Sequence, residues 1–241
     1  GMGAGCAMAM SGIDMALWDI RGKAVGWPLY RLLGGAQKPI PAYAGGVSLG
    51  YQDPSALVDE ARPHLEAGYR AIKLRVGDSP RRDLARIEAV RKAAGDDIDI
   101  LVDANTAYSV KDARAVMPAM DELNVGWLEE PFPPHDHRSY QLATSFGQVP
   151  LASGENHFTR FEFNRVIEDG AITILQPDIS KTGRHHRAVA HRRDGVRLQA
   201  ADQSAHLHDR PEHGGDDPRA RRDRQRRVFR GRRVAQQSVP R

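Results

Sequence analysis

The sequence predicts an α/β fold, a (β/α) barrel with about six strand–helix units. Three observations indicate it: short apolar runs alternate with amphipathic segments, the runs end in charged residues, and three of the terminal carboxylates are evenly spaced. Strand–helix alternation is typical of a parallel sheet covered by helices. An open, doubly wound sheet is the alternative until the motifs are considered.

The strand runs are short, apolar and regularly placed along the chain. Between them, residues 54–67 and 80–94 have the periodicity of amphipathic helices. Gly68 and Gly95 stand where these helices should end, because glycine readily adopts the conformation that stops a helix. The expected strands are residues 40–44, 71–76, 98–102, 125–128, 149–152 and 171–175.

Charged and polar residues follow the expected strands at the end where barrel active sites lie. Side chains alternate along a strand, so Lys73 and Arg75 share one face, and Asp103 and Asn105 share a face in the same way. Lys73 and Asn105 are candidate substrate-binding residues. The alternative for Lys73 and Arg75 is a solvated strand end without a function.

Three carboxylates recur at an equal interval. Asp103, Glu129 and Glu155 are separated by 26 residues each, which predicts one height on three consecutive strands. Converging carboxylates repel one another unless a cation compensates them, and all-oxygen ligands favour Mg²⁺ over Mn²⁺ or Ca²⁺. Each carboxylate taken singly could instead cap the following helix.

Six strings in their order along the chain resemble the mandelate racemase/muconate lactonizing enzyme family of the enolase superfamily. The resemblance implies that Asp103, Glu129 and Glu155 bind Mg²⁺ and that Glu130 supports them or is structural. The strings are residues 11–20 (SGIDMALWDI), 32–35 (LLGG), 102–105 (VDAN), 127–131 (WLEEP), 153–156 (SGEN) and 176–178 (QPD).

The family removes the proton α to a substrate carboxylate, and the metal stabilises the resulting enediolate. The second lysine of a Lys-x-Lys motif is commonly the base, but here the motif reads Lys73-x-Arg75. Arginine is a poor base because its pKa lies above about 12. Lys73 is therefore expected to bind the carboxylate and to help neutralise the enediolate.

The third catalytic candidate, beside Lys73 and Arg75, is Asp178. An aspartate at this position resembles the mandelate racemase branch, in which it orients a histidine from the next strand. The alternative for Asp178 alone is a helix cap. A general acid opposite the base would permit loss of a β-hydroxyl, so dehydration of an acid sugar is preferred over racemisation.

The composition changes abruptly after residue 183. Residues 1–183 hold 19 Lys and Arg against 24 Asp and Glu, whereas residues 184–241 hold 16 Arg, no Lys and 7 Asp and Glu. We interpret residues 184–241 as an Arg-rich tail, out of frame and disordered. Reading the reverse-translated gene one base later permits strings that resemble the family's last strands, and the histidine partner of Asp178 would lie there.

The chain is accordingly divided into three parts. Residues 1–38 are the end of a capping domain that is otherwise largely absent, residues 39–183 are an incomplete barrel with the metal site, and residues 184–241 are the tail. Cys6 is the only cysteine, so no intrachain disulfide forms and a cytoplasmic location is expected. No apolar run is long enough to cross a membrane.

Three functions remain at this point. The first is a Mg²⁺-dependent dehydratase or racemase acting on a hydroxy-carboxylate or an acid sugar, homo-oligomeric as is common in the family. The second is an inactive, metal-binding fragment of such an enzyme. The third is nucleic-acid binding through the tail, which its single aromatic residue, Phe229, does not support.

Overall fold

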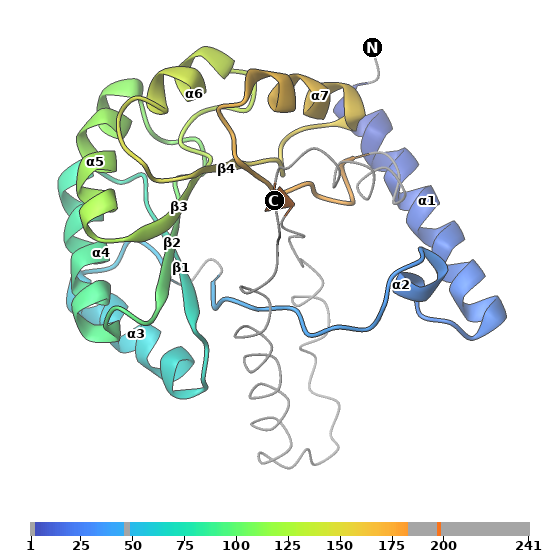
Figure 1. The fold of residues 1–241 in the computed structure, drawn as a ribbon, viewed down its shortest axis with the longest axis horizontal. Coiled ribbons are helices and arrows are strands. Elements are labelled where there is room, and N and C mark those ends of the chain that lie inside the picture. The colour runs from blue at the N-terminus through green and yellow to red at the C-terminus, as the bar shows by residue number, and fades with distance from the viewer. Residues whose placement is uncertain (1–2, 46–48, 183–196, 199–241) are drawn as a thin grey trace, which may run out of the picture.

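The computed structural model describes residues 3–45, 49–182 and 197–198. In this part of the chain, six strands form one parallel sheet in the order β1-β2-β3-β4-β5-β6, and helices α3 to α7 lie on its outer side (Figure 1). The helices are α1 (Ala4–Val25), α2 (Leu29–Leu32), α3 (Pro54–Glu66), α4 (Pro80–Ala94), α5 (Val110–Glu122), α6 (His137–Ala143) and α7 (Thr159–Asp169). The strands are β1 (Ala71–Arg75), β2 (Asp99–Asp103), β3 (Val125–Glu129), β4 (Leu151–Ser153), β5 (Ile174–Leu175) and β6 (Arg197–Leu198).

The α/β alternation predicted from the sequence is confirmed, and so are the two predicted helices, now α3 and α4. Of the expected tail, residues 184–241, only β6 is described; it pairs in parallel with β5. The expectation for the rest of the tail lies outside the described residues, and the division of the chain at residues 38 and 183 stays a prediction.

The predicted strand at residues 40–44 was wrong in extent. Only Ala44 pairs there, through a parallel bridge to Ile72 of β1. Pro39 and Pro41 have no N–H to give to a strand ladder, which limits regular pairing along this segment. The predicted strand at residues 171–175 is likewise reduced to its last two residues, the strand β5.

The strand register brings two of the predicted metal ligands to the same height. Asp103 at the end of β2 is the register partner of Arg75 on one side and of Glu129 on the other. The partner of Glu129 on β4 is Ala152, so Glu155 follows beyond the end of that strand. Equal sequence spacing therefore did not give equal height for Glu155, because the β3–β4 offset is shorter than the β2–β3 offset.

Two apolar clusters hold the sheet. The larger lies between the sheet and its outer helices. It includes Leu57 of α3, Ile72 of β1, Ile87 of α4, Met117 of α5 and Phe163 of α7, all almost fully buried. The smaller lies on the inner side of the strands and consists of Leu101, Trp127, Ala152 and Ile174, with Tyr43 and Ala71 packed against it. This inner cluster borders the residues that the sequence predicts as functional.

Helix α1 lies apart from the arc of outer helices (Figure 1). Its buried residues are the small ones, Ala7, Ser11 and Gly22, whereas Ile13 and Leu17 are exposed. No helix among the described residues combines the length and the apolar composition that crossing a membrane requires.

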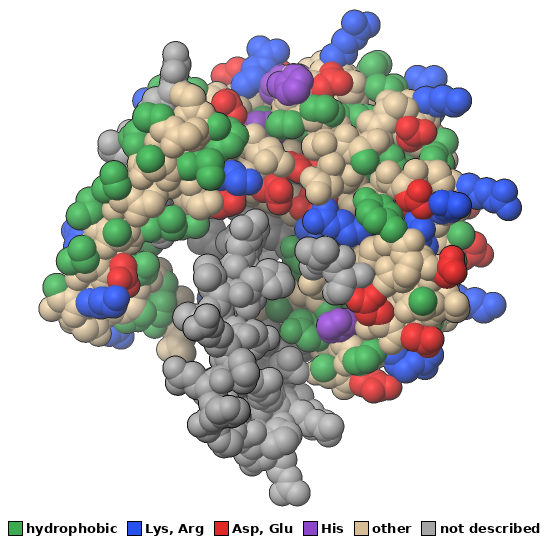
Figure 2. Space-filling model, turned by 180° about the vertical axis from the view of Figure 1, so that it is seen from behind, with side chains coloured by type: hydrophobic (Ala, Val, Ile, Leu, Met, Phe, Trp, Pro, Cys, Tyr) green, Lys and Arg blue, Asp and Glu red, His purple; other side chains and the backbone are tan. Residues whose placement is uncertain are grey.

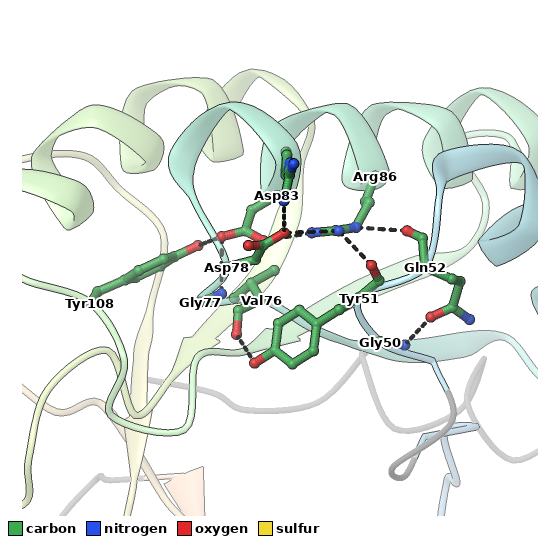
Figure 3. Close-up of polar contacts among 10 residues, drawn as sticks. Gly50, Tyr51, Gln52, Val76, Gly77, Asp78, Asp83, Arg86 and Tyr108 are labelled. Atoms are coloured by element: carbon green, nitrogen blue, oxygen red, sulfur yellow. Dashed lines mark hydrogen bonds and ion pairs between the residues drawn. The ribbon is translucent and has the colours of Figure 1, made fainter.

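A buried polar network fixes the exit of β1 (Figure 3). Arg86 of α4 donates from Nε to the Gln52 carbonyl at 2.8 Å and from Nη2 to the Tyr51 carbonyl at 2.6 Å. Its guanidinium also pairs with Asp83 at 3.2 Å and with Asp78 at 3.0 Å. The Arg86 side chain is almost wholly buried, so these contacts supply the partners that a buried cation needs.

Asp83 is the anionic centre of this network and is fully buried. Besides Arg86, it accepts hydrogen bonds from the backbone N–H of Gly77 and from the Tyr108 hydroxyl, both at 2.9 Å. The segment that Arg86 holds is also bonded to β1, because the Arg75 N–H donates to the Leu49 carbonyl at 2.7 Å. The network thus fixes the chain beside Arg75, one of the predicted site residues.

Candidate active site

Lys73 joins the ends of β2 and β3. Its Nζ lies 3.1 Å from Asp103 Oδ2 and 3.0 Å from Glu129 Oε1. All three side chains are largely buried. Burial alone would lower the pKa of Lys73, but the carboxylates of Glu129 and Asp103 raise it above its ordinary value. Lys73 therefore stays positively charged and acts as a fixed cation between two anions.

Two further residues hold the second oxygen of Glu129. Trp127 Nε1 donates to Glu129 Oε2 at 3.1 Å, and Gln176 Nε2 donates to the same oxygen at 2.9 Å. Burial raises the pKa of Glu129 despite its contact with Lys73. Sequence reasoning missed both donors. Trp127 lies two residues before Glu129, and Gln176 lies two residues before Asp178. Because side chains alternate along a strand, Trp127 could have been expected on the same face as Glu129, and Gln176 on the same face as Asp178.

Tyr43 is a further site residue that sequence reasoning missed. Lys73 Nζ lies 5.7 Å from the centre of the Tyr43 ring, which packs edge-on against Trp127 at 5.9 Å. Burial raises the pKa of the Tyr43 hydroxyl. Residues 39–45 contain no charged residue and form only a single bridge to the sheet, so no sequence pattern indicated that Tyr43 belongs to the site.

Arg75 and Asn105 flank Asp103. Arg75 Nη1 lies 3.5 Å from Asp103 Oδ2, and about a quarter of the Arg75 side chain is exposed. The backbone N–H of Asn105 donates to Asp103 Oδ1 at 2.9 Å, and Asn105 is exposed with a φ of 44°. Non-glycine residues with positive φ are strained, and such strain often occurs at functional sites.

Glu155 acts through its charge on Glu130, the residue that follows Glu129. Burial and, next in size, the charge of the half-buried Glu155 raise the pKa of Glu130 to about 7. Asn156 Nδ2 donates to both oxygens of Glu130, each at 3.1 Å. The structure thus brings Lys73, Asp103 and Glu129 together, and among the described residues it does not group Glu155 with them.

Asp178 follows β5 and has its own partners. Its Oδ1 accepts from the Ser180 N–H and from the Ser180 hydroxyl, both at 2.7 Å. Its Oδ2 lies 3.7 Å from Lys181 Nζ. The contact with the Ser180 N–H caps a turn and not a helix, which was the alternative for Asp178 in the sequence analysis. The ion pair with Lys181 had no counterpart there.

Carboxylates gather on the inner side of the arc, and Figure 2 shows Asp and Glu side chains there beside Lys and Arg. No group of three or more His, Cys, Asp or Glu side chains in the described ranges is arranged to hold a metal ion. The donor chemistry nevertheless fits a hard cation, because every candidate ligand offers carboxylate oxygens. The raised pKa values of Glu129 and Glu130 indicate negative charge that burial leaves poorly compensated.

Comparisons with known proteins identify the family of this chain. The sequence matches the description "Enolase C-terminal domain-like" over residues 56–202 and "Mandelate racemase / muconate lactonizing enzyme, N-terminal domain" over residues 2–34. The first match extends past residue 183, where the composition of the sequence changes. Arabinonate dehydratase of Saccharolobus solfataricus is 36% identical over 183 residues, which are 74% of this chain and 49% of that protein.

Solved structures give the same result. A member of the enolase superfamily from Polaromonas sp. JS666 is 55% identical, with a TM-score of 0.74 over 76% of this chain and 49% of that chain. A racemase from Streptomyces coelicolor A3(2) with bound magnesium is 32% identical, with a TM-score of 0.76 over 82% of this chain and 57% of that chain. The chain spans about half the length of the relatives it matches. With the barrel-type fold and the family resemblance both confirmed, the chain belongs to the mandelate racemase/muconate lactonizing enzyme family of the enolase superfamily.

Proposed function

We propose that the chain carries the metal half of an acid-sugar dehydratase site, with Mg²⁺ held by Asp103, Glu129 and Glu155. The observation that carries this proposal is the pair of buried carboxylates at adjacent strand ends, Asp103 and Glu129, which share the Lys73 ammonium. A hard cation would neutralise these oxygens more fully than one ammonium group. The dehydratase named above supports the reaction, and the magnesium in the racemase structure supports the metal.

A bound Mg²⁺ would act as a Lewis acid toward the substrate carboxylate. Lys73 would bind that carboxylate and balance its growing negative charge, because its pKa is raised and it keeps its proton. Metal binding would require the Lys73 ammonium to give up contacts with Asp103 or Glu129. The Lys73 ammonium would then be available to contact the substrate carboxylate.

Arg75 and Asn105 would bind and orient the substrate rather than move a proton. Arg75 stays charged, and its guanidinium has only the one long contact with Asp103 among those described. Asp178 is the acid–base candidate, and its Oδ2 lies next to the Lys181 ammonium. Loss of a β-hydroxyl after α-proton removal would give an enol that becomes a 2-keto acid.

A second candidate is metal binding without catalysis. It is favoured by the partners of Asp178, because Ser180 and Lys181 already contact both of its oxygens. It is also favoured by the position of Glu155, which the described structure does not gather with Asp103 and Glu129. Such a protein would bind Mg²⁺ and leave acid sugars unchanged.

Incubation of the full chain with aldonic and aldaric acids, Mg²⁺ and deuterated water separates these candidates. NMR would follow both the 2-keto acid product and exchange of the α-hydrogen. If the parent protein forms the 2-keto acid and the Glu129→Gln variant does not, the result supports the dehydratase. Exchange without product indicates a racemase-type reaction, and neither signal from a protein that binds Mg²⁺ supports the inactive candidate.

A further inference from the structure

Asn156 connects the ends of three strands. It follows β4, its Nδ2 donates to both oxygens of Glu130 after β3, and its Oδ1 accepts from Lys181 Nζ at 3.4 Å. Lys181 in turn lies 3.7 Å from Asp178 after β5. The four side chains form one line, from the Asp178 carboxylate through the Lys181 ammonium and the Asn156 amide to the Glu130 carboxyl group.

The two ends of Asn156 have different partners, which fixes the orientation of its amide. If the amide were turned over, its oxygen would face the Glu130 carboxylate and its NH₂ would face the Lys181 ammonium. Both of those arrangements are repulsive. Lys181, which lies in the turn after β5, therefore favours the same orientation of Asn156 that Glu130 favours.

Glu130 needs a partner because of its backbone and its neighbours. Its φ is 40°, a left-handed conformation that side chains rarely adopt. Its N–H donates to the Ala152 carbonyl at 2.9 Å, and its own carbonyl accepts from the Thr106 N–H at 2.7 Å. Its carboxylate is buried beside like charges, among them Glu155, so a donor must hold it.

Glu129 and Glu130 are consecutive residues with different partners. Glu129 contacts Lys73, whereas Glu130 contacts Asn156. If Glu130 lost Asn156, repulsion from Glu155 and strain at its backbone would favour rearrangement of the peptide that joins it to Glu129. The orientation of Glu129 thus depends on a contact made by Glu130.

We propose that Asn156, oriented by Lys181, is a positioning residue that holds Glu130 aside and thereby keeps Glu129, the preceding residue, in place for binding Mg²⁺. This inference rests on the proposed metal site. Asn156 and Lys181 do not ligate the cation in this proposal; they act through Glu130. Residues that support metal ligands in this way typically contribute about 10–100-fold to metal affinity.

The test uses Trp127 as its probe, because Trp127 donates to Glu129. Trp18→Phe and Trp27→Phe leave Trp127 as the single tryptophan of the full chain. Mg²⁺ is titrated against its fluorescence in this background, in Asn156→Leu, in Lys181→Met and in Lys181→Arg. Circular dichroism checks that each variant is folded.

Asn156→Leu is expected to weaken Mg²⁺ binding by at least about 10-fold. Lys181→Met should weaken it to a smaller degree, and Lys181→Arg should restore it, because arginine also donates to the Asn156 oxygen. The double variant, which combines Asn156→Leu with Lys181→Met, should bind Mg²⁺ no more weakly than Asn156→Leu alone, since Lys181 acts through Asn156. Lys23→Met is the matched control; it removes an exposed lysine on α1 and should leave the affinity unchanged.

The outcomes separate the two proposals. Absence of Mg²⁺ binding in the single-tryptophan parent would overturn the metal site and this inference together. Binding by the parent, with Asn156→Leu and Lys181→Met equal to it, would overturn only the role of Asn156. Additive losses in the double variant would contradict the action of Lys181 through Asn156.

Discussion

Arg86→Met removes the guanidinium at the centre of the network in Figure 3 and keeps most of its aliphatic stem. The change leaves Asp83, which is fully buried, without its cation. It also removes the donors to the carbonyls of Tyr51 and Gln52. Breaking a buried ion pair from one side costs about 3–5 kcal/mol, because the remaining charge stays buried and uncompensated.

Arg82→Met is the matched control for this variant. Arg82 contacts the same Asp78 oxygen as Arg86, at 3.5 Å, but 71% of its side chain is exposed. Exposed ion pairs contribute little because water and salt screen them, so this variant should leave the free energy of unfolding nearly unchanged.

Urea unfolding followed by far-ultraviolet circular dichroism measures both variants. We expect the unfolding midpoint of Arg86→Met to fall strongly and that of Arg82→Met to stay near the parent value. Equal losses in the two variants, or a loss below about 1 kcal/mol for Arg86→Met, would refute the argument that burial makes this network stabilising.

Three further predictions test other parts of the structure. Folded Glu130 keeps its proton up to about pH 7, whereas the unfolded chain releases it near 4.5, so stability should fall by roughly 3 kcal/mol as the pH rises through this window. Glu130→Gln should remove that fall in urea unfolding series at several pH values, and an unchanged pH dependence would contradict it. Ser109→Ala removes the N-cap of α5 and should cost about 1 kcal/mol in thermal unfolding; no loss would show that the capping box is not formed. Gly154→Ala would place a Cβ 2.7 Å from the Gln176 backbone and should cost about 3 kcal/mol, whereas Gly12→Ala, with nothing within 4 Å, should stabilise α1 by about 0.5–1 kcal/mol. Equal effects of the two glycine variants would show that the close approach is not real.

The sequence predicted the parts of the site that follow from strand periodicity. Because parallel strands end at one edge, the strand-end position of Lys73 and the equal spacing of the carboxylates predicted a common edge, where Lys73 contacts Asp103 and Glu129. The same argument was wrong about the height of Glu155, because it assumed a constant offset between strands. The register of one strand against the next depends on packing that the spacing of residues does not reveal.

The partners of the carboxylates were harder to predict than the carboxylates themselves. Tyr43 lies in a segment that pairs with the sheet through a single bridge, from Ala44 to Ile72. Its contact with Lys73 depends on the direction of its side chain. The bonds of Asn156 to Glu130 and Lys181 join residues from three different loops. Loop conformation is set by tertiary contacts, so local sequence patterns carry no direct signal for such pairs.

The most direct test of the proposed metal site is calorimetric titration of Mg²⁺ into the full chain and into Asp103→Asn. The proposal predicts one saturable site in the parent and a large loss of affinity in the variant, because Asp103 supplies oxygens at the end of β2 beside those of Glu129. No saturable binding by the parent, or equal binding by both proteins, would contradict a magnesium site at these strand ends.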